Sequence, residues 1–256
     1  MANKKILMTY FMLTENATHI ASFANQYRAA FTLAEVLITL GTIGIVAALT
    51  LPNLIQGYQK RVTVTRLQNV YSTISQAAQK GQAEYGDSEN WDYTLSGNDF
   101  FDKYLFDINK VSRVKFNTVA PDYKTRNDNG LFRAYVFAQH KSKSNVITLP
   151  NGAWIIYFDA LHYPGSTSGY IPILADINGA QNPNIMGIDL FYLYLLPNGK
   201  VVFNQSNNSE SRDQLDRSRN ELMNGTSRYS CKNEGAWCGA VIQRDGWHIA
   251  KDYPWK

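Results

Sequence analysis

The chain of 256 residues is poor in the residue types that build metal centres and catalytic sites. It contains two Cys and four His residues, and the two thiols lack the second Cys pair or nearby His that a zinc site needs. It has no Gly-x-Ser-x-Gly elbow, no phosphate-binding loop and no His-Glu-x-x-His helix. The histidines, which stand at no catalytic spacing, are His19, His140, His162 and His248. We therefore do not expect an enzyme.

Strong charge of either sign is also lacking, because the whole chain carries a formal charge of only +4. Three arginines, Arg212, Arg217 and Arg219, gather in a polar stretch over 204–220, which we expect to be an exposed loop. Acidic residues alternate with them and neutralise the patch: Glu210, Asp213, Asp216 and Glu221. Nucleic acid is therefore not an expected partner.

One long apolar run is present, from Phe31 to Leu51, and Pro52 follows it. A helix over this run is roughly 31 Å long, which matches the hydrocarbon core of a bilayer. Its only charged residue is Glu35, and the run holds no Lys, Arg or His to pair with it. Since an ionisable group in a membrane helix usually has a partner and a function, the partner of Glu35 must come from elsewhere.

The segment Phe31-Thr32-Leu33-Ala34-Glu35 resembles the N-terminal signature of type IV pilins and type II secretion pseudopilins. The resemblance implies a prepilin leader at 1–30, which a prepilin peptidase removes between Ala30 and Phe31, followed by methylation of the Phe31 amine. The family usually has Gly at the position of Ala30. In the family, the Glu at the position of Glu35 contacts the terminal amine of an adjacent subunit during filament assembly.

The same resemblance extends along the apolar run. Gly44 and Pro52 stand where many pilins have a Gly and a Pro bracketing a stretch of helix that can loosen in the filament. Gly lowers helix propensity by about 1 kcal/mol, and Pro removes one backbone hydrogen bond. We expect these two positions to be the weak points of the helix.

Two simpler interpretations of the apolar run stay open. It is a signal peptide cut near Ala48, or a plain anchor that tethers an exported binding domain. The positive charges near the run favour the opposite orientation, since Arg28 precedes it whereas Lys60, Arg61 and Arg66 follow it. A large C-terminal domain can be translocated regardless of this charge, so we expect a single-pass bacterial inner-membrane protein with its globular domain exported.

The helical pattern continues through 53–85, where apolar residues recur every three or four positions. We expect one helix of about 50 residues that ends near Gly81 or Gly86. Its first half, 31–52, is the membrane and assembly segment, and its second half is amphipathic and packs on a soluble domain. The residues of the apolar stripe are Leu67, Val70, Tyr71, Ile74, Ala77 and Ala78.

Residues 86–256 predict a globular β-rich domain. An irregular region over 88–130 precedes a series of β-rich segments bounded by turn residues. Two of the connections are Leu-Pro-Asn-Gly, at 149–152 and 196–199, and each predicts a tight hairpin. The expected strands are 133–138, 145–149, 153–158, 171–176, 190–195 and 200–203. The fold class is therefore α+β, with a long N-terminal helix packed on a mostly antiparallel sheet, as in type IV pilins.

The two cysteines, Cys231 and Cys238, stand close together near the C-terminus. In an exported domain such a pair most simply closes a small disulfide loop, whereas in the cytosol it would be two free thiols. Pilin-like proteins often have a disulfide near the C-terminus, which agrees with the resemblance.

The segment from Asp176 to Asp189 is the candidate for a specific site in the globular domain. Asp176, Asn178 and Asp189 carry oxygen ligands, together with two further asparagines, and calcium is the cation that such oxygens suit. The EF-hand pattern is absent, because the twelfth position holds Gly187. The same residues suit a turn that binds nothing, and both interpretations stay open.

Together these features predict a structural subunit, minor or specialised, of a type IV pilus or a type II secretion pseudopilus. The expected partners are other pilin or pseudopilin subunits, a prepilin peptidase, the inner-membrane assembly machinery and membrane lipid. The alternative is a membrane-anchored exported binding domain that does not polymerise.

Overall fold

The structure is a computed structural model, and it describes residues 31–106, 112–115, 123–127, 144–158, 171–203 and 217–255. The expected leader at 1–30, the expected strand at 133–138, and His19, His140 and His162 lie outside the described residues. The chain divides into two compact units, Met1–Ile55 and Gln56–Lys256. The boundary falls inside one long helix.

That helix, α2, runs over Leu33–Tyr85 and has 53 residues, which confirms the expected helix of about 50. Pro52 lies within it. In the first unit its large apolar side chains are exposed, for example Leu37 at 61% and Leu49 at 71%. In the second unit one face is buried, and the buried residues, which recur at helical spacing, are Thr63, Val64, Leu67, Val70, Ile74, Ala78 and Gly81. The amphipathic second half is therefore confirmed.

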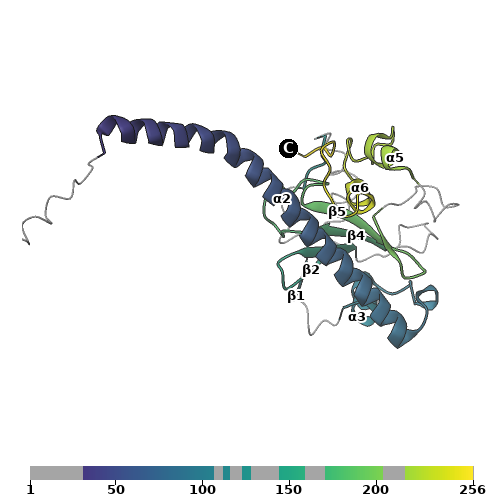
Figure 1. Cartoon of the computed structure of the whole chain (residues 1–256). Helices are drawn as coiled ribbons and strands as arrows, with labels where there is room; N and C mark the ends of the chain where they lie inside the picture. The colour runs from purple at the N-terminus through teal and green to yellow at the C-terminus, as the bar shows by residue number, and fades with distance from the viewer. Residues whose placement is uncertain are drawn as a thin grey trace, which may run out of the picture. The chain divides into compact units, whose positions relative to one another are not determined.

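The second unit is built on an antiparallel sheet (Figure 1). Its strands in the described part of the chain are β1 (Ser112–Lys115), β2 (Ser144–Thr148), β3 (Trp154–Phe158), β4 (Ile171–Asp176), β5 (Leu190–Leu195) and β6 (Val201–Val202). They lie in the order β1-β2-β3-β4-β5-β6, so each strand pairs with its neighbours in sequence, and every pairing is antiparallel.

The two Leu-Pro-Asn-Gly segments form the same tight turn, as expected. Gly152 and Gly199 both adopt positive φ, at +82° and +74°, a region that Gly enters without steric cost. Each donates its N–H to the carbonyl of the Leu three residues earlier, at 2.9 Å. These turns join β2 to β3 and β5 to β6 and fix the registers of both hairpins.

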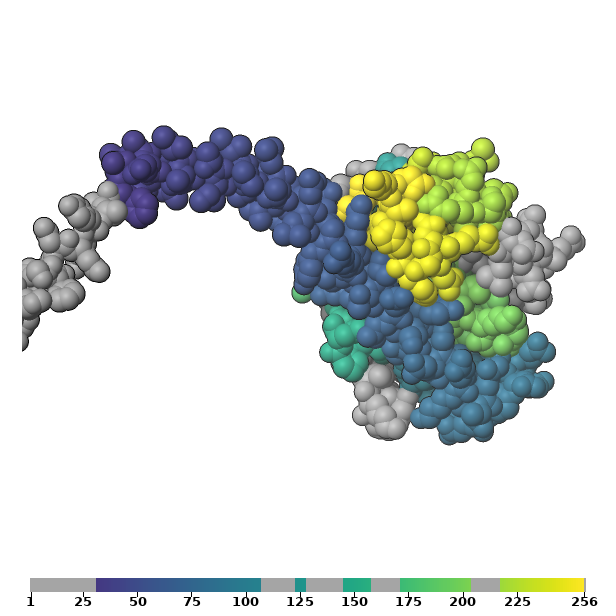
Figure 2. Space-filling model, in the orientation of Figure 1, coloured from purple at the N-terminus to yellow at the C-terminus, as the bar shows by residue number. Residues whose placement is uncertain are grey.

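The core lies between the buried face of α2 and the sheet. Tyr71 of α2 stacks on Phe203 with ring centroids 5.4 Å apart, and the Trp247 ring lies 5.3 Å from the same Tyr71 ring. The C-terminal segment, yellow in Figure 2, accordingly lies against the blue part of α2. Burial of these large rings supplies much of the free energy that holds the helix on the sheet.

The region 88–130, which the sequence predicts to be irregular, contains regular structure in its described part. A short 3₁₀ helix covers Ser88–Asn90, and α3 covers Gly97–Tyr104. Ser96 caps α3 by accepting the N–H of Asp99, and Phe101 stacks on Tyr157 of β3 at 3.9 Å. The prediction was wrong here because tertiary packing of aromatic side chains decides the structure of so short a segment.

Two further helices were not predicted. α5 (Arg219–Asn224) begins inside the stretch 204–220 that we expected to be a loop, and a capping box between Ser218 and Glu221 starts it. α6 (Cys238–Arg244) follows the second cysteine. The described end of the polar stretch is therefore ordered against α6, whereas Arg212 and residues 204–216 lie outside the described residues.

Candidate functional site

The N-terminal end of α2 is closed by a reciprocal pair of hydrogen bonds between Thr32 and Glu35. Thr32 Oγ1 accepts the backbone N–H of Glu35 at 3.2 Å. Glu35 Oε2 in turn accepts the backbone N–H and the hydroxyl of Thr32, both at 2.9 Å. This is a capping box, and it satisfies two backbone donors that have no partner within the helix. It places the carboxylate one turn from Phe31, whose side chain is 83% exposed.

Among the described residues, the glycines of the apolar half, Gly41 and Gly44, pack against nothing. A Cβ added at Gly41 or Gly44 would meet no atom within 4 Å in the described structure. The absence of a Cβ at Gly44 is therefore not required by contacts among the described residues. Whether Gly44 and Pro52 weaken the helix in an assembly stays a prediction.

The segment between β4 and β5 folds into a closed turn around Asp189. Asp189 is 4% exposed, and its two carboxylate oxygens accept the backbone N–H groups of Asn184 and Ile185, each at 2.7 Å. The side-chain amide of Asn178 donates to Asp189 Oδ2 at 3.3 Å. Burial raises the pKa of Asp189, and the two backbone donors oppose this shift. Asp189 therefore holds the turn together.

Asp176 lies at the other end of this turn and is fully buried. Its Oδ2 accepts the hydroxyl proton of Tyr123 at 2.7 Å, and its Oδ1 accepts the N–H of Asn178 at 3.3 Å. Burial raises the pKa of Asp176 to about 8, the Tyr123 hydrogen bond lowers it and the nearby Asp189 charge raises it further. Burial also raises the pKa of Tyr123 well above its ordinary range.

Tyr123 belongs to a short segment, 123–127, that we name the strap. Lys124 of the strap pairs with the turn through two backbone hydrogen bonds, from its N–H to Asn184 and from Met186 to its carbonyl, both 2.9 Å. Arg126 donates its side chain to the carbonyls of Gly187 and Pro254, and its backbone N–H to Glu234 at 3.2 Å. The strap thus joins the turn, the loop around the cysteines and the C-terminal tail.

One feature of this turn favours the calcium hypothesis, and two others oppose it. Two amide oxygens, Oδ1 of Asn178 and Oδ1 of Asn184, are buried and have no hydrogen-bond partner among the described residues. A side-chain oxygen that binds a cation would be left without a hydrogen-bond partner in the same way. The carboxylate of Asp189, however, already accepts backbone donors. No group of three or more His, Cys, Asp or Glu side chains within the described ranges is placed to hold a metal. Calcium binding therefore stays a prediction, which a calorimetric titration of the chain with Ca²⁺ tests.

A groove of about 330 Å³ opens between this turn and the part of α2 that belongs to the second unit. Aromatic, aliphatic and polar side chains share its walls. The lining residues are Tyr58, Gln59, Val62, Thr63, Arg66, Ile177, Asn178, Asn182, Pro183, Ile188, Asp189 and Trp255. Mixed walls of this kind are usual for a binding surface.

Cys231 and Cys238 form a disulfide, as expected, with Cα atoms 4.5 Å apart. The bonded pair packs directly against the turn. A Cβ added at Gly187 would lie 2.5 Å from Cys238 Sγ and 2.7 Å from an Arg126 nitrogen, and Gly187 also adopts φ of +77°. Only Gly fits this position, so the disulfide loop and the turn are built as one packed region.

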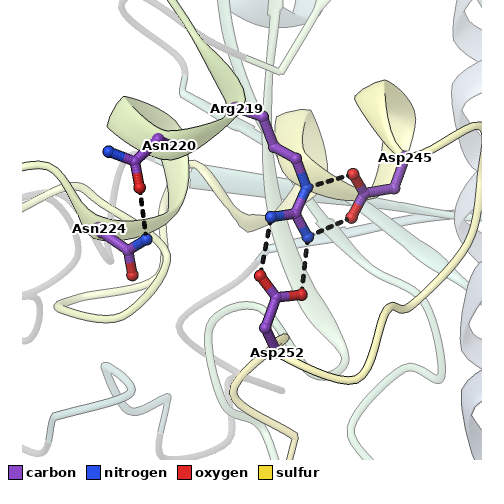
Figure 3. A network of polar contacts seen from close by, with 5 residues as sticks. All are labelled: Arg219, Asn220, Asn224, Asp245 and Asp252. Atoms are coloured by element: carbon purple, nitrogen blue, oxygen red, sulfur yellow. Dashed lines mark hydrogen bonds and ion pairs between the residues drawn. The ribbon is translucent and has the colours of Figure 1, made fainter.

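Arg219 is held between two carboxylates (Figure 3). Its guanidinium makes paired hydrogen bonds to Asp245 at the end of α6 and to Asp252 in the C-terminal tail, with 2.8 Å contacts to each. These two partners raise the pKa of Arg219. These bonds hold α5 against α6 and the C-terminal tail. Arg219 therefore stabilises the fold and is not part of an exposed basic patch.

Sequence reasoning located Glu35, Asp176 and Asp189 but missed Thr32 and Tyr123. Thr32 carried a readable signal, since Thr-x-x-Glu before an apolar run is the pattern of a capping box. Tyr123 carried none, because its partner lies 53 residues away. His248, the described histidine, is exposed.

Taken together, the fold and site define an α+β protein in which an N-terminal apolar helix continues into an antiparallel-sheet domain. In the described part of the chain, α2 is the one helix long and apolar enough to cross a membrane. The chain belongs to a family of unknown function, DUF6613, whose model matches residues 53–256. Searches of curated proteins and of solved structures found no match.

Proposed function

We propose that this chain is a structural subunit, minor or specialised, of a type IV pilus or a type II secretion pseudopilus. In this proposal a prepilin peptidase removes residues 1–30, the Phe31 amine is methylated, and the apolar half of α2 spans the inner membrane until the subunit is extracted into a filament. The globular domain is exported.

The observation that carries the proposal is the position of Glu35, a carboxylate at the start of a helix long enough to span a membrane. Cleavage before Phe31 creates a cationic amine next to Thr32, one helical turn from the Glu35 carboxylate. The two charges are poorly solvated in lipid, so each gains most by meeting an opposite charge there. A neighbouring copy supplies that amine in a filament.

Two further observations support the proposal. The apolar side chains of 33–55 are exposed and need either lipid or other helices to cover them, and Gly44 packs against none of the described residues. The second half of α2 packs on an antiparallel sheet closed by a C-terminal disulfide loop, which is an arrangement pilin-like proteins use.

The alternative is an anchored binding domain that does not polymerise. The groove beside Trp255 favours it, because an open cavity with mixed walls suits a ligand. The family model, which begins at residue 53, covers the globular part and not the apolar half.

Intact-mass measurement of the protein purified from its native membrane separates the two functions. The proposal expects a chain that begins at Phe31 and carries one extra methyl group. Retention of residues 1–30 would leave an anchored domain. A Glu35→Ala variant adds a second readout, since normal incorporation into filaments would contradict the proposed assembly contact.

A further inference from the structure

The part of α2 that follows the apolar half is cationic, and it has no acidic residue before Glu84. Between Glu35 and Glu84 the sequence contains no Asp or Glu, whereas Lys60, Arg61 and Arg66 appear in quick succession after the apolar residues end. We name these three residues the basic collar. A helix of this composition carries its charge without neutralisation from its own neighbours.

The collar is also unpaired in the folded chain. In the part of the chain that the structure describes, none of the three cations makes an ion pair. Arg66 shares the groove with Asp189, but the Asp189 carboxylate is occupied by backbone N–H groups. Arg61 and Arg66 are exposed, and Lys60 is half-buried. The collar is therefore free to meet an external anion.

The collar follows the apolar run closely enough for two of its side chains to extend towards the lipid headgroups. Lys60 follows Leu51, the last residue of the apolar run, by nine positions, which is about 13.5 Å of helical rise. The polar layer on each face of a bilayer is about 5 to 8 Å thick. Side chains of a helix point back towards its N-terminus, so the long side chains of Lys60 and Arg61 extend towards this layer, whereas Arg66 lies farther from the membrane.

The collar surrounds the helix instead of forming one stripe. Successive residues of a helix are about 100° apart, so the three side chains leave the helix in three directions separated by about 100° to 140°. Lys60 lies at the edge of the buried face, and Arg61 lies on the side away from it. A protein partner docks on one side of a helix, whereas headgroups surround it on all exposed sides. Aromatic neighbours fit the same layer, since Tyr58 is 69% exposed and Trp255 lines the groove beside it.

We propose that Lys60, Arg61 and Arg66 bind the phosphate groups of anionic phospholipids around α2. The inference rests on the proposed membrane insertion of the apolar half, but it does not depend on polymerisation. It gives the positive charge that follows the apolar run a role in lipid binding.

The test uses the full chain in phosphatidylcholine vesicles, with trace spin-labelled phosphatidylglycerol or spin-labelled phosphatidylcholine. Electron paramagnetic resonance measures how much of each labelled lipid is immobilised by the protein. We expect phosphatidylglycerol to be favoured at least about 3-fold over phosphatidylcholine, and less so in about 0.5 M salt. Lys60→Gln, Arg61→Gln and Arg66→Gln together should bring the ratio close to 1.

The matched control removes three other charges, by Lys80→Gln, Lys124→Gln and Lys200→Gln, and should keep the preference. Equal immobilisation of both lipids by the unmodified chain would overturn the inference while leaving insertion intact. Loss of self-association in the collar variant with an unchanged lipid ratio would overturn it in favour of a second copy of the chain. Immobilisation of neither lipid would remove membrane insertion itself, and the inference with it.

Discussion

Tyr123 donates its hydroxyl proton to Asp176 across 2.7 Å, in a position where the Asp176 side chain is fully buried. The strap and the end of β4 are therefore joined by a hydrogen bond whose acceptor is one titratable carboxyl group. Because burial disfavours the ionised form, this group titrates far from the ordinary range of an Asp.

This pairing predicts how stability depends on pH. The pKa of Asp176 is about 8 in the folded chain against an ordinary value of 3.8, so the folded state holds a proton that the unfolded state has lost. The free energy of unfolding should therefore fall as pH rises from about 4 to about 8, and this contribution should be constant above that range. Urea unfolding of the full chain in detergent micelles, followed from pH 5 to 9, measures the slope.

The matched variants isolate the group responsible. Asp176→Asn should reduce the slope but not abolish it, because the pKa of Asp189 is also raised. Asp87→Asn removes an exposed carboxylate whose side chain makes no capping bond, and it should leave the slope unchanged. Equal slopes in Asp176→Asn and the unmodified chain would contradict the assignment.

Two glycines of α2 should respond oppositely to the same substitution. A Cβ at Gly81 would lie 2.1 Å from the carbonyl oxygen of Tyr104, so Gly81→Ala must push α3 away from α2 and should cost about 1 to 3 kcal/mol. Gly57 has no atom within 4 Å, so Gly57→Ala should stabilise the helix by about 0.5 to 1 kcal/mol. Denaturant unfolding of both variants checks the two signs, and a neutral Gly81→Ala would show that α3 does not pack there.

Loss of the disulfide should destabilise the globular domain. Replacing Cys231 and Cys238 by Ser together should lower the free energy of unfolding by about 2 to 3 kcal/mol, because a short closed loop is released in the unfolded chain. A reducing agent should lower the stability of the unmodified chain by a similar amount and leave the double variant unchanged. A reductant-insensitive unmodified chain would count against the bond.

The Thr32–Glu35 pair allows capping to be separated from charge. Glu35→Gln keeps an oxygen that accepts the Thr32 N–H, so the helix start should persist, but it removes the negative charge. Filament incorporation should then fall at least about tenfold, as in Glu35→Ala. Thr32→Ala should weaken the helix start by about 1 kcal/mol and reduce incorporation less.

Quantitative immunoblotting of sheared filaments measures the incorporation of each variant. Normal incorporation of Glu35→Gln with a defect in Thr32→Ala would show that only the cap matters. That result would remove the charge from the proposed assembly mechanism.

The parts of the fold that could be predicted are those in which a local pattern decides the structure. The ends of β4 and β5 agree with the sequence prediction, because each is a mainly apolar segment bounded by turn residues. The two Leu-Pro-Asn-Gly turns were equally readable, since Pro and Gly act on their own backbone angles. The length of α2 followed from the continuous apolar run at 31–51 and the periodic pattern that continues it through 53–85.

The missed elements are short and depend on distant partners. α3, α5 and α6 have 8, 6 and 7 residues, which is too few to show a helical period reliably. The capping signals of α3 and α5, Ser96 before Asp99 and Ser218 before Glu221, were present but are common in turns as well. The strand β1 has four residues and forms because it pairs with β2. Its own sequence does not predict that pairing.

Part of the candidate site could likewise be predicted from the sequence, and part could not. Glu35 could be located because an isolated charge in an apolar run is conspicuous from the sequence alone. The role of Asp189 as the centre of a closed turn, and the union of Tyr123 with Asp176, depend on contacts that only the folded chain creates. The oxygen-rich composition of the turn was visible, but the direction of its hydrogen bonds was not.

Among the described strands, each pairs with those before and after it in the chain, and this has a kinetic consequence. Nearest-neighbour pairing keeps loop-closure entropy small, so successive hairpins can assemble one after another along the chain. The helix, which emerges earliest, must wait for the last strand before its buried face is fully covered. Maturation should therefore be limited by this docking step and not by strand pairing.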